Sequence, residues 1–364
     1  MLPDDPLGRT AQQDVAGRCL DQGRHRCQGC GDGVTPSPLT WSAQAGRVLW
    51  LDKAKGLGIV LVVFGHAWLG AQAAGLLPAD KVFHTVEKLI YSFHMPLFFL
   101  LAGFTFEASA RRRPLLRGAR DKALRLLWPL LLWTYIFAGF RYLAGGAVNS
   151  PETLSDLFTS PLPPRDHLWF LWALFLIQML GLLIAVPGVR PRPAWVWLAL
   201  ALLGAMAIVS LPGLPLGPLT VNAALHLGIF LLGIWLARAG PLPSGVPVRL
   251  KALTVFVIVQ FISFGLPENV VAFQVIAAVL SLCFVVMLNA PLGALGHFLV
   301  RLGRLSMPIY LAHTLFTAAT RIALFKITDD PTLHLVLGTC AGLIGPVVLY
   351  YAVRAVASPR LLGF

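Results

Sequence analysis

Long apolar runs, separated by short connections rich in proline, glycine and charge, dominate the 364 residues of this chain. A helix that crosses the hydrocarbon core of a bilayer needs about 20 consecutive, mostly apolar residues. Ten segments satisfy this rule, namely 56–76, 86–107, 123–143, 167–187, 194–212, 220–239, 250–266, 270–289, 304–325 and 333–353. The pattern therefore predicts an all-α, polytopic integral membrane protein with about ten transmembrane helices.

Composition agrees with this fold class. Only 12% of the residues are charged, about half of the share found in soluble domains, and 57% are hydrophobic. We expect residues 47–355 to form one transmembrane domain, between a polar, disordered N-terminal tail (1–46) and a short cytoplasmic C-terminal tail (356–364). The N-terminal tail holds one Cys-x-x-Cys pair. A zinc site needs a second half, so no metal is expected.

The charge distribution predicts the orientation. A net charge of +13 would suggest nucleic acid as a partner of a soluble protein, but no soluble basic domain is evident, so none is expected. If the N-terminus is cytoplasmic, 23 of the 29 lysines and arginines fall on the inner side of the predicted helices. By the positive-inside rule, we expect both termini in the cytoplasm and the chain in the inner (plasma) membrane, among its lipids.

Lys55 and His66 share the first apolar segment. At about 100° per residue, the eleven steps between them return to within about 20° of the same helix face, roughly 16 Å further along. One face would then carry a cation near the water and an imidazole inside the membrane. Ionisable groups within membrane helices are costly, and they are candidates for function by default.

Three further histidines lie in or beside apolar segments, each within a short, dense motif. The motifs are Phe-His-Met-Pro-Leu-Phe-Phe around His94, His-Leu-Trp-Phe-Leu-Trp from His167, and Ser-Met-Pro-Ile-Tyr-Leu-Ala-His ending at His313. An imidazole can take up and return a proton near neutral pH. His66 and His94 are therefore candidate catalytic residues. His167, Trp169 and His313 are candidates for binding the acceptor substrate.

The run Arg47-Val-Leu-Trp-Leu-Asp-Lys-Ala-Lys-Gly and its continuation to His66 resemble the opening motif of the membrane-bound acyltransferase type 3 family. The run looks closest to the branch of fucose 4-O-acetylase-like proteins. The family pattern is a basic residue, ten residues and then a histidine, which Lys55 and His66 satisfy. The three other histidine motifs resemble further family signatures, in order and on separate predicted helices. The resemblance implies an acyl-CoA donor and a hydroxyl acceptor, usually on a glycan.

A physical interpretation of the site stands beside this resemblance. Coenzyme A is a cytosolic anion that carries its thioester on a long arm, and a positive cleft concentrates an anionic ligand. The candidate donor-binding residues at the cytosolic side are Lys55, Arg111, Arg112, Arg113, Arg117 and Arg125. His66 lies about three helical turns deeper, a separation comparable to that arm. Our hypothesis is that His66 removes the proton of the acceptor hydroxyl as it attacks the thioester of acetyl-CoA.

Each candidate also has a purely structural interpretation. Lys55 could be an anchor that snorkels to the interface, and His66 or His313 could hydrogen-bond between helices. His94 could cap the turn that the proline two residues later breaks, and His167 could be an interfacial residue. The arginines could serve topology and lipid contact.

The leading function is a membrane O-acyltransferase that acetylates a glycan, a lipid-linked glycan or a glycosylated metabolite. The main alternative is a transporter or flippase of a small or lipid-linked substrate. Transporters usually show internal repeats, and none is evident here. A third possibility is an inactive relative with a role in interaction or sensing. The presence of both Lys55 and His66 argues against it.

Overall fold

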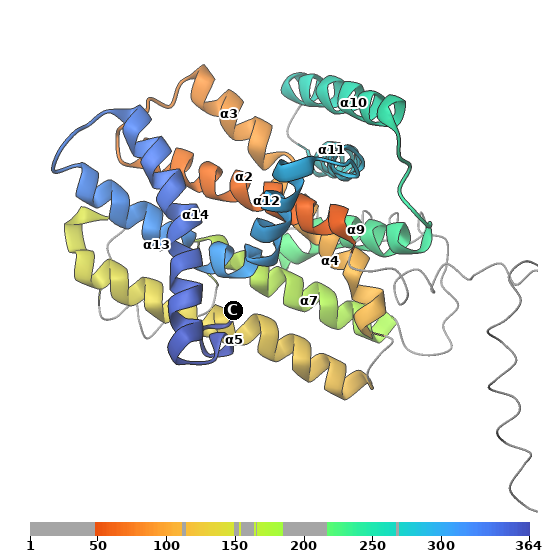
Figure 1. The fold of residues 1–364 in the computed structure, drawn as a ribbon, viewed down its shortest axis with the longest axis horizontal. Coiled ribbons are helices and arrows are strands. Elements are labelled where there is room, and N and C mark those ends of the chain that lie inside the picture. Colours follow the sequence, from red (N-terminus) through yellow and green to blue (C-terminus); the bar gives the residue numbers. More distant parts are fainter. Residues whose placement is uncertain are drawn as a thin grey trace, which may run out of the picture.

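The computed structural model describes residues 48–110, 114–148, 153, 164, 166–184, 217–266 and 269–364. Within this part of the chain every regular element is a helix (Figure 1). Three predictions lie outside the described residues: the disordered tail 1–46, the span 194–212 and the donor-binding role of Arg111, Arg112 and Arg113.

The α-helices are α2 (Leu49–Ala73), α3 (Lys81–Tyr91), α4 (His94–Ala110), α5 (Leu115–Ala144), α7 (Trp169–Ile184), α9 (Gly217–Arg238), α10 (Val246–Gly265), α11 (Val270–Leu288), α12 (Gly293–Arg304), α13 (Ser306–Leu324) and α14 (Pro331–Val356). Short 3-10 turns are η2 (Gly145–Ala147), η3 (Asp166–Leu168) and η4 (Pro359–Leu362). Seven helical stretches in the described part are long and apolar enough to cross a membrane: α2, α3 with α4, α5, α9, α10, α11 and α14. The chain is therefore a polytopic membrane protein whose described elements are all helices.

The predicted spans 167–187 and 304–325 correspond to α7 and α13, which are not among these seven stretches. Two further features differ from the sequence prediction. The predicted span 86–107 is two helices, α3 and α4, which meet at Ser92–Phe93. Because α4 begins at His94, Pro96 falls in its first turn, where the missing N–H of proline costs little. The second feature is α12, a helix of 12 residues that is too short for the 20-residue rule. Its buried face, which includes Leu299, packs on α2.

Helix α2 lies at the centre of the bundle (Figure 1), where it contacts α3, α4, α11, α12, α13 and α14. The backbones of α2 and α12 lie in direct contact. A Cβ added to Gly56 would lie 2.0 Å from the carbonyl oxygen of Leu299, and one added to Gly303 would lie 1.9 Å from that of Asp52. Small residues allow membrane helices to approach this closely. The two glycines thus fix the position of the helix that carries Lys55.

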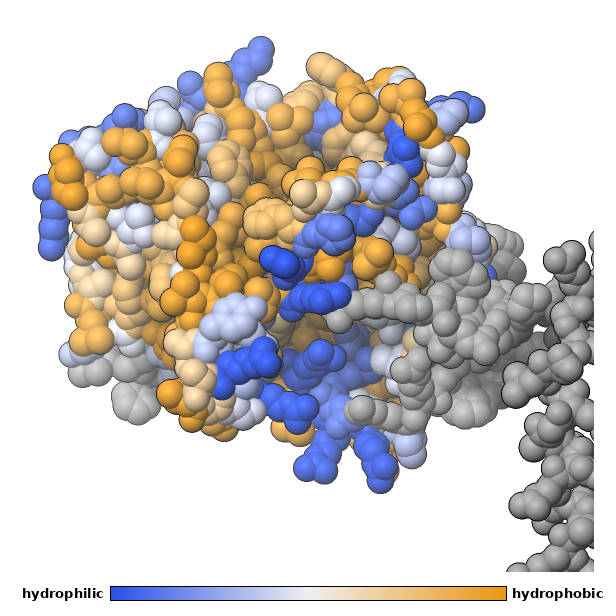
Figure 2. Space-filling view, in the orientation of Figure 1, coloured by the Kyte–Doolittle hydropathy of each residue, from blue (hydrophilic) through white to orange (hydrophobic). Residues whose placement is uncertain are grey.

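Charged side chains gather at one end of the bundle, where α2 and α5 begin and α4 and α9 end; we call it the basic end. Glu107 of α4 accepts a hydrogen bond of 2.6 Å from Nε of Arg238 in α9. Asp52 lies 3.9 Å from Nε of Arg304, and Lys53 donates to a backbone carbonyl between α11 and α12 at 2.5 Å. Figure 2 shows hydrophilic residues over the region of α12 and the first half of α5, surrounded by hydrophobic surface. The sequence predicts that this end faces the cytosol.

The C-terminal segment lies against α5. Nε1 of Trp133 donates to the carbonyl of Leu362 at 2.9 Å, and Nε1 of Trp128 donates to that of Leu361 at 3.0 Å. The ring of Phe364 lies 5.9 Å from that of Trp133. These contacts tie residues 361–364 to the middle of α5.

Candidate active site

Three of the predicted histidines converge from distant parts of the chain. His66 lies on α2, His167 on η3 and His313 on α13. The ring centroids of His66 and His313 are 4.9 Å apart, those of His167 and His313 are 4.9 Å apart, and those of His66 and His167 are 5.7 Å apart. All three pairs meet edge to face. His167 and His313 are buried and His66 is partly exposed. We call this group the histidine triad.

Backbone carbonyls select the tautomer of two rings of the triad, those of His66 and His313. Nδ1 of His66 lies 2.9 Å from the carbonyl oxygen of Val62, one turn earlier, and Nδ1 of His313 lies 2.8 Å from that of Tyr310. A carbonyl oxygen can only accept a hydrogen bond, so each Nδ1 carries the proton and donates it. In the neutral ring, Nε2 is then left with its lone pair. His66 and His313 both present the atom that a general base needs.

The third member, His167, is held through its backbone. The hydroxyl of Tyr310 donates to the carbonyl oxygen of His167 at 2.5 Å. Next to it, Asp166 pairs with Arg141 of α5. The turn that carries His167 is therefore fastened to both α13 and α5. The ring of His167 also lies edge to face against Phe137 of α5, at 5.2 Å.

The triad lies nearer the end of the bundle opposite the basic end. His66 is seven residues before the end of α2 at Ala73, or about 10 Å along the helix. Lys55 lies eleven residues earlier, about 16 Å away in the other direction. His167 lies two residues before the start of α7, at the end of the bundle where α5 finishes.

His94 does not join the triad. It is fully buried at the start of α4, and its Nδ1 lies 2.8 Å from the carbonyl oxygen of Ile90. Its ring meets that of Tyr91 edge to face at 4.5 Å, and the Tyr91 ring lies 6.4 Å from that of His66. His94 is thus linked to His66 through Tyr91.

Trp169 belongs to a second aromatic group. Its ring lies 5.5 Å from that of His226 and 6.2 Å from that of Phe99, and His226 stacks on Phe99 at 4.5 Å. This group fills the space between α4, α7 and α9. Although Trp169 is two residues from His167, the helical turn directs it to a different set of neighbours.

The predicted donor-binding residues that the structure describes lie at the basic end. Lys55 is half-buried on α2, and Arg117 and Arg125 are exposed on the first half of α5. Between these arginines, Lys122 donates to the side-chain oxygen of Gln178 in α7 at 3.1 Å. The exposed arginines give the first half of α5 a positively charged surface at the same end of the bundle as Lys55.

Two tyrosines of the site escaped the sequence analysis. The hydroxyl of Tyr310 fastens η3, and the hydroxyl of Tyr91 is buried without a hydrogen-bond partner in the described part of the chain. Tyr310 stands three residues before His313 on the same helix, and Tyr91 stands three residues before His94 across the junction of α3 and α4. The spacing of Tyr310 and His313, typical of neighbours on one helix face, was the available signal for that pair.

The three imidazoles do not form a metal centre. Among the residues that the structure describes, no group of three or more His, Cys, Asp or Glu side chains could hold a metal ion. With Nδ1 donating to a backbone carbonyl, Nε2 of His66 and of His313 can accept a proton.

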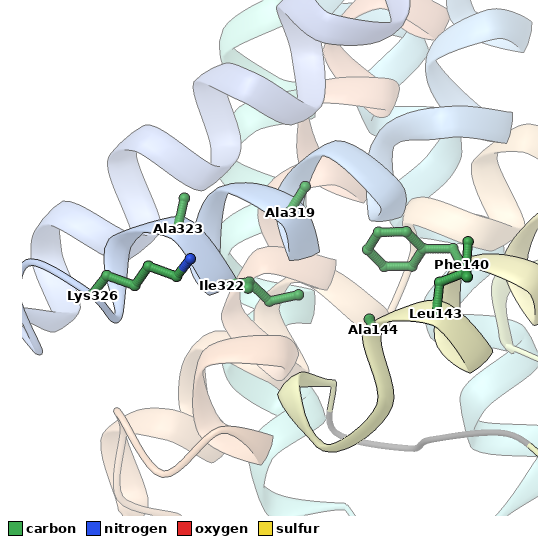
Figure 3. Close-up of a pocket in the computed structure, with 7 residues that line it drawn as sticks. All are labelled: Phe140, Leu143, Ala144, Ala319, Ile322, Ala323 and Lys326. Atoms are coloured by element: carbon green, nitrogen blue, oxygen red, sulfur yellow. The ribbon is translucent and has the colours of Figure 1, made fainter.

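An open groove of about 380 Å³ lies between the ends of α5 and α13 (Figure 3). Its lining is Phe140, Leu143, Ala144, Ala319, Ile322, Ala323 and Lys326. Figure 3 shows the ammonium of Lys326 turned toward Ile322, across from Phe140 and Ala144. Phe140 is one turn beyond Phe137, whose ring touches that of His167. The groove therefore begins about one helical turn from the triad.

Comparison with known proteins assigns the amino-acid sequence to a family. The family described as "Acyltransferase domain", of acyltransferase type 3, matches residues 48–351. The chain is 30% identical to the nodulation protein NolL of Mesorhizobium japonicum over 176 residues, 47% of this chain and 44% of the relative. It is 28% identical to NolL of Sinorhizobium fredii over 216 residues, 58% of this chain and 54% of the relative. The chain thus spans about half the length of these relatives. No solved structure matches it.

Proposed function

This chain belongs to the acyltransferase type 3 family, and on that premise we propose that it moves an acetyl or other short acyl group from acyl-CoA to a hydroxyl of a glycan or glycolipid. The observation that carries the proposal is the position of His66. It stands in a group of three histidines and offers a free Nε2 lone pair. His66 also lies on the same helix as Lys55, which is near the basic end.

In the proposed reaction, the acceptor hydroxyl gives its proton to Nε2 of His66 while its oxygen attacks the thioester carbonyl carbon. A carbon–oxygen bond forms, and the carbonyl becomes an oxyanion. When the oxyanion collapses, the carbon–sulfur bond breaks. The coenzyme A thiolate leaves and takes the proton back from the imidazolium. His167 and His313, which border His66, contact the acceptor.

The donor would enter from the basic end. Lys55, Arg117 and Arg125 supply positive charge for the phosphates of coenzyme A, and the sequence continues this charge through Arg111–Arg113. The separation of about 16 Å between Lys55 and His66 leaves room for the extended arm that carries the thioester. With this end in the cytosol, the donor comes from the compartment in which it is made.

The acceptor would reach the triad from the opposite end. The triad lies nearer that end, and the apolar groove between α5 and α13 begins about one turn from it. An acyl or isoprenoid chain fits such a groove, while a sugar attached to it could extend toward His167. This arrangement favours an amphiphilic acceptor in the cell membrane.

His94 and Trp169 take different places in this proposal. His94 contacts Tyr91 rather than the triad, so we assign it to support of the catalytic group. Trp169 packs with Phe99 and His226 between α4, α7 and α9, so we assign it to support of the helix that follows His167 rather than to contact with the acceptor.

The test uses purified protein in lipid nanodiscs, with release of coenzyme A and acetylation of a glycolipid as readouts. Replacing His66 with Gln should lower turnover by about 10²- to 10⁴-fold, as expected for loss of a general base. The matched control is His297→Gln, because His297 is exposed on α12. Equal turnover of the two variants would refute the role of His66. Movement of glycolipid across the bilayer without acyl-CoA would favour the transporter.

A further inference from the structure

Tyr91 closes α3 beside the histidine triad, yet its hydroxyl makes no hydrogen bond with the described part of the chain. The hydroxyl oxygen is buried. A buried polar group without a hydrogen-bond partner lowers the stability of the fold, and such atoms are uncommon in folded proteins. A phenylalanine would fill the same space without that cost. The hydroxyl therefore needs an explanation other than packing.

The backbone of α2 determines where this hydroxyl lies. A Cβ added to Gly65 would stand 3.2 Å from the ring of Tyr91 and 3.4 Å from its hydroxyl oxygen. The ring thus rests on α2 at the residue directly before His66, in space that a larger side chain would take. On its other side the ring meets His94 edge to face at 4.5 Å. Gly65 and His94 together hold the hydroxyl next to the turn that carries His66.

Few hydrogen-bond donors around His66 remain available. His313 has committed its N–H to backbone carbonyls, and Tyr310 has committed its hydroxyl to the carbonyl of His167. Tyr91 and His167 retain uncommitted donors. His167 lies beside Asp166 at the end where the groove opens, which is the acceptor's side. Tyr91 rests on Gly65, one residue nearer Lys55 than His66 and away from Asp166.

We propose that the Tyr91 hydroxyl donates a hydrogen bond to the thioester carbonyl oxygen as that oxygen becomes an oxyanion. This inference rests on the proposed function. While His66 takes the acceptor proton, the electron pair of the C=O bond moves onto oxygen, where the Tyr91 O–H stabilises it. When the pair returns and the carbon–sulfur bond breaks, Tyr91 keeps its proton throughout. A preorganised donor of this kind acts on the transition state more strongly than on the bound substrate.

Tyr91→Phe separates this role from a structural one. Losing an oxyanion donor should lower kcat about 10²- to 10³-fold, with the KM for acetyl-CoA within about twofold of wild type. The melting temperature should stay the same or rise, because an unpaired buried hydroxyl has been removed. The matched control is Tyr351→Phe, at an exposed position on α14, which should leave both quantities unchanged.

Gly65→Ala provides a second variant with the hydroxyl retained. Its methyl group must displace the Tyr91 ring by a few tenths of an ångström, so kcat should fall less than in Tyr91→Phe. A Tyr91→Phe protein with kcat within threefold of wild type would overturn the inference, as would a loss of activity matched by a lower melting temperature. If wild type transfers an acyl group and His66→Gln does not, the proposed function stands whatever Tyr91→Phe does.

Discussion

Replacing Gly56 with Ala should weaken the bundle at the contact between α2 and α12. The added Cβ would lie 2.0 Å from the carbonyl oxygen of Leu299, whereas an ordinary carbon–oxygen contact is about 3.3 Å. The obstacle is backbone, so no side-chain rotation can relieve the clash. The two helices would have to separate by about 1 Å, which typically costs 1–3 kcal/mol for overpacking.

The matched control is Gly139→Ala on α5, where nothing lies within 4 Å of an added Cβ. Alanine is a better helix former than glycine, so this variant should gain about 0.5–1 kcal/mol. Thermal unfolding of the purified proteins in one detergent compares the two directly. We expect Gly56→Ala to melt several degrees below wild type and Gly139→Ala at or slightly above it. Equal melting temperatures for the two variants would refute the backbone contact between α2 and α12.

Two further predictions concern the entry of each substrate. Lys55→Ala should raise the KM for acyl-CoA about five- to tenfold with kcat little changed, because one charge contact of about 1 kcal/mol is lost. The control is Lys251→Ala, because Lys251 is exposed on α10. A fall in kcat at constant KM would contradict a role of Lys55 in donor binding. Ala319→Trp should fill the groove and raise the KM for a lipid-linked acceptor while leaving the KM for a water-soluble sugar unchanged. Equal effects on the two KM values would show that the acceptor does not bind in the groove.

Much of this architecture could be predicted from the sequence because apolar length and charge act locally along the chain. The rule of about 20 apolar residues located a helix at every predicted span within the described residues. It could not locate α12, because a short helix that packs on α2 through Leu299 lacks the length of a span. It also merged α3 with α4, although Pro96 marks the first turn of a new helix.

The histidines illustrate the same limit at the site. Their motifs identified His66, His167 and His313 as candidates, and the structure brings these three together. The motifs could not show that His94 and Trp169 join other neighbours, because that depends on how α4 and α7 enter the bundle. The hydrogen bond of Tyr310 and the unpartnered hydroxyl of Tyr91 required the structure for the same reason.

The most direct test of the central claim is the acetyl content of surface glycans and glycolipids, measured by mass spectrometry. Cells lacking this protein would be complemented with wild type, His66→Gln or His297→Gln at equal expression. We predict that wild type and His297→Gln restore an acetyl group on one glycan or glycolipid, and that His66→Gln does not. Full acetylation by His66→Gln, or no acetylated product with wild type, would contradict the assignment of His66 as the base of an O-acyltransferase.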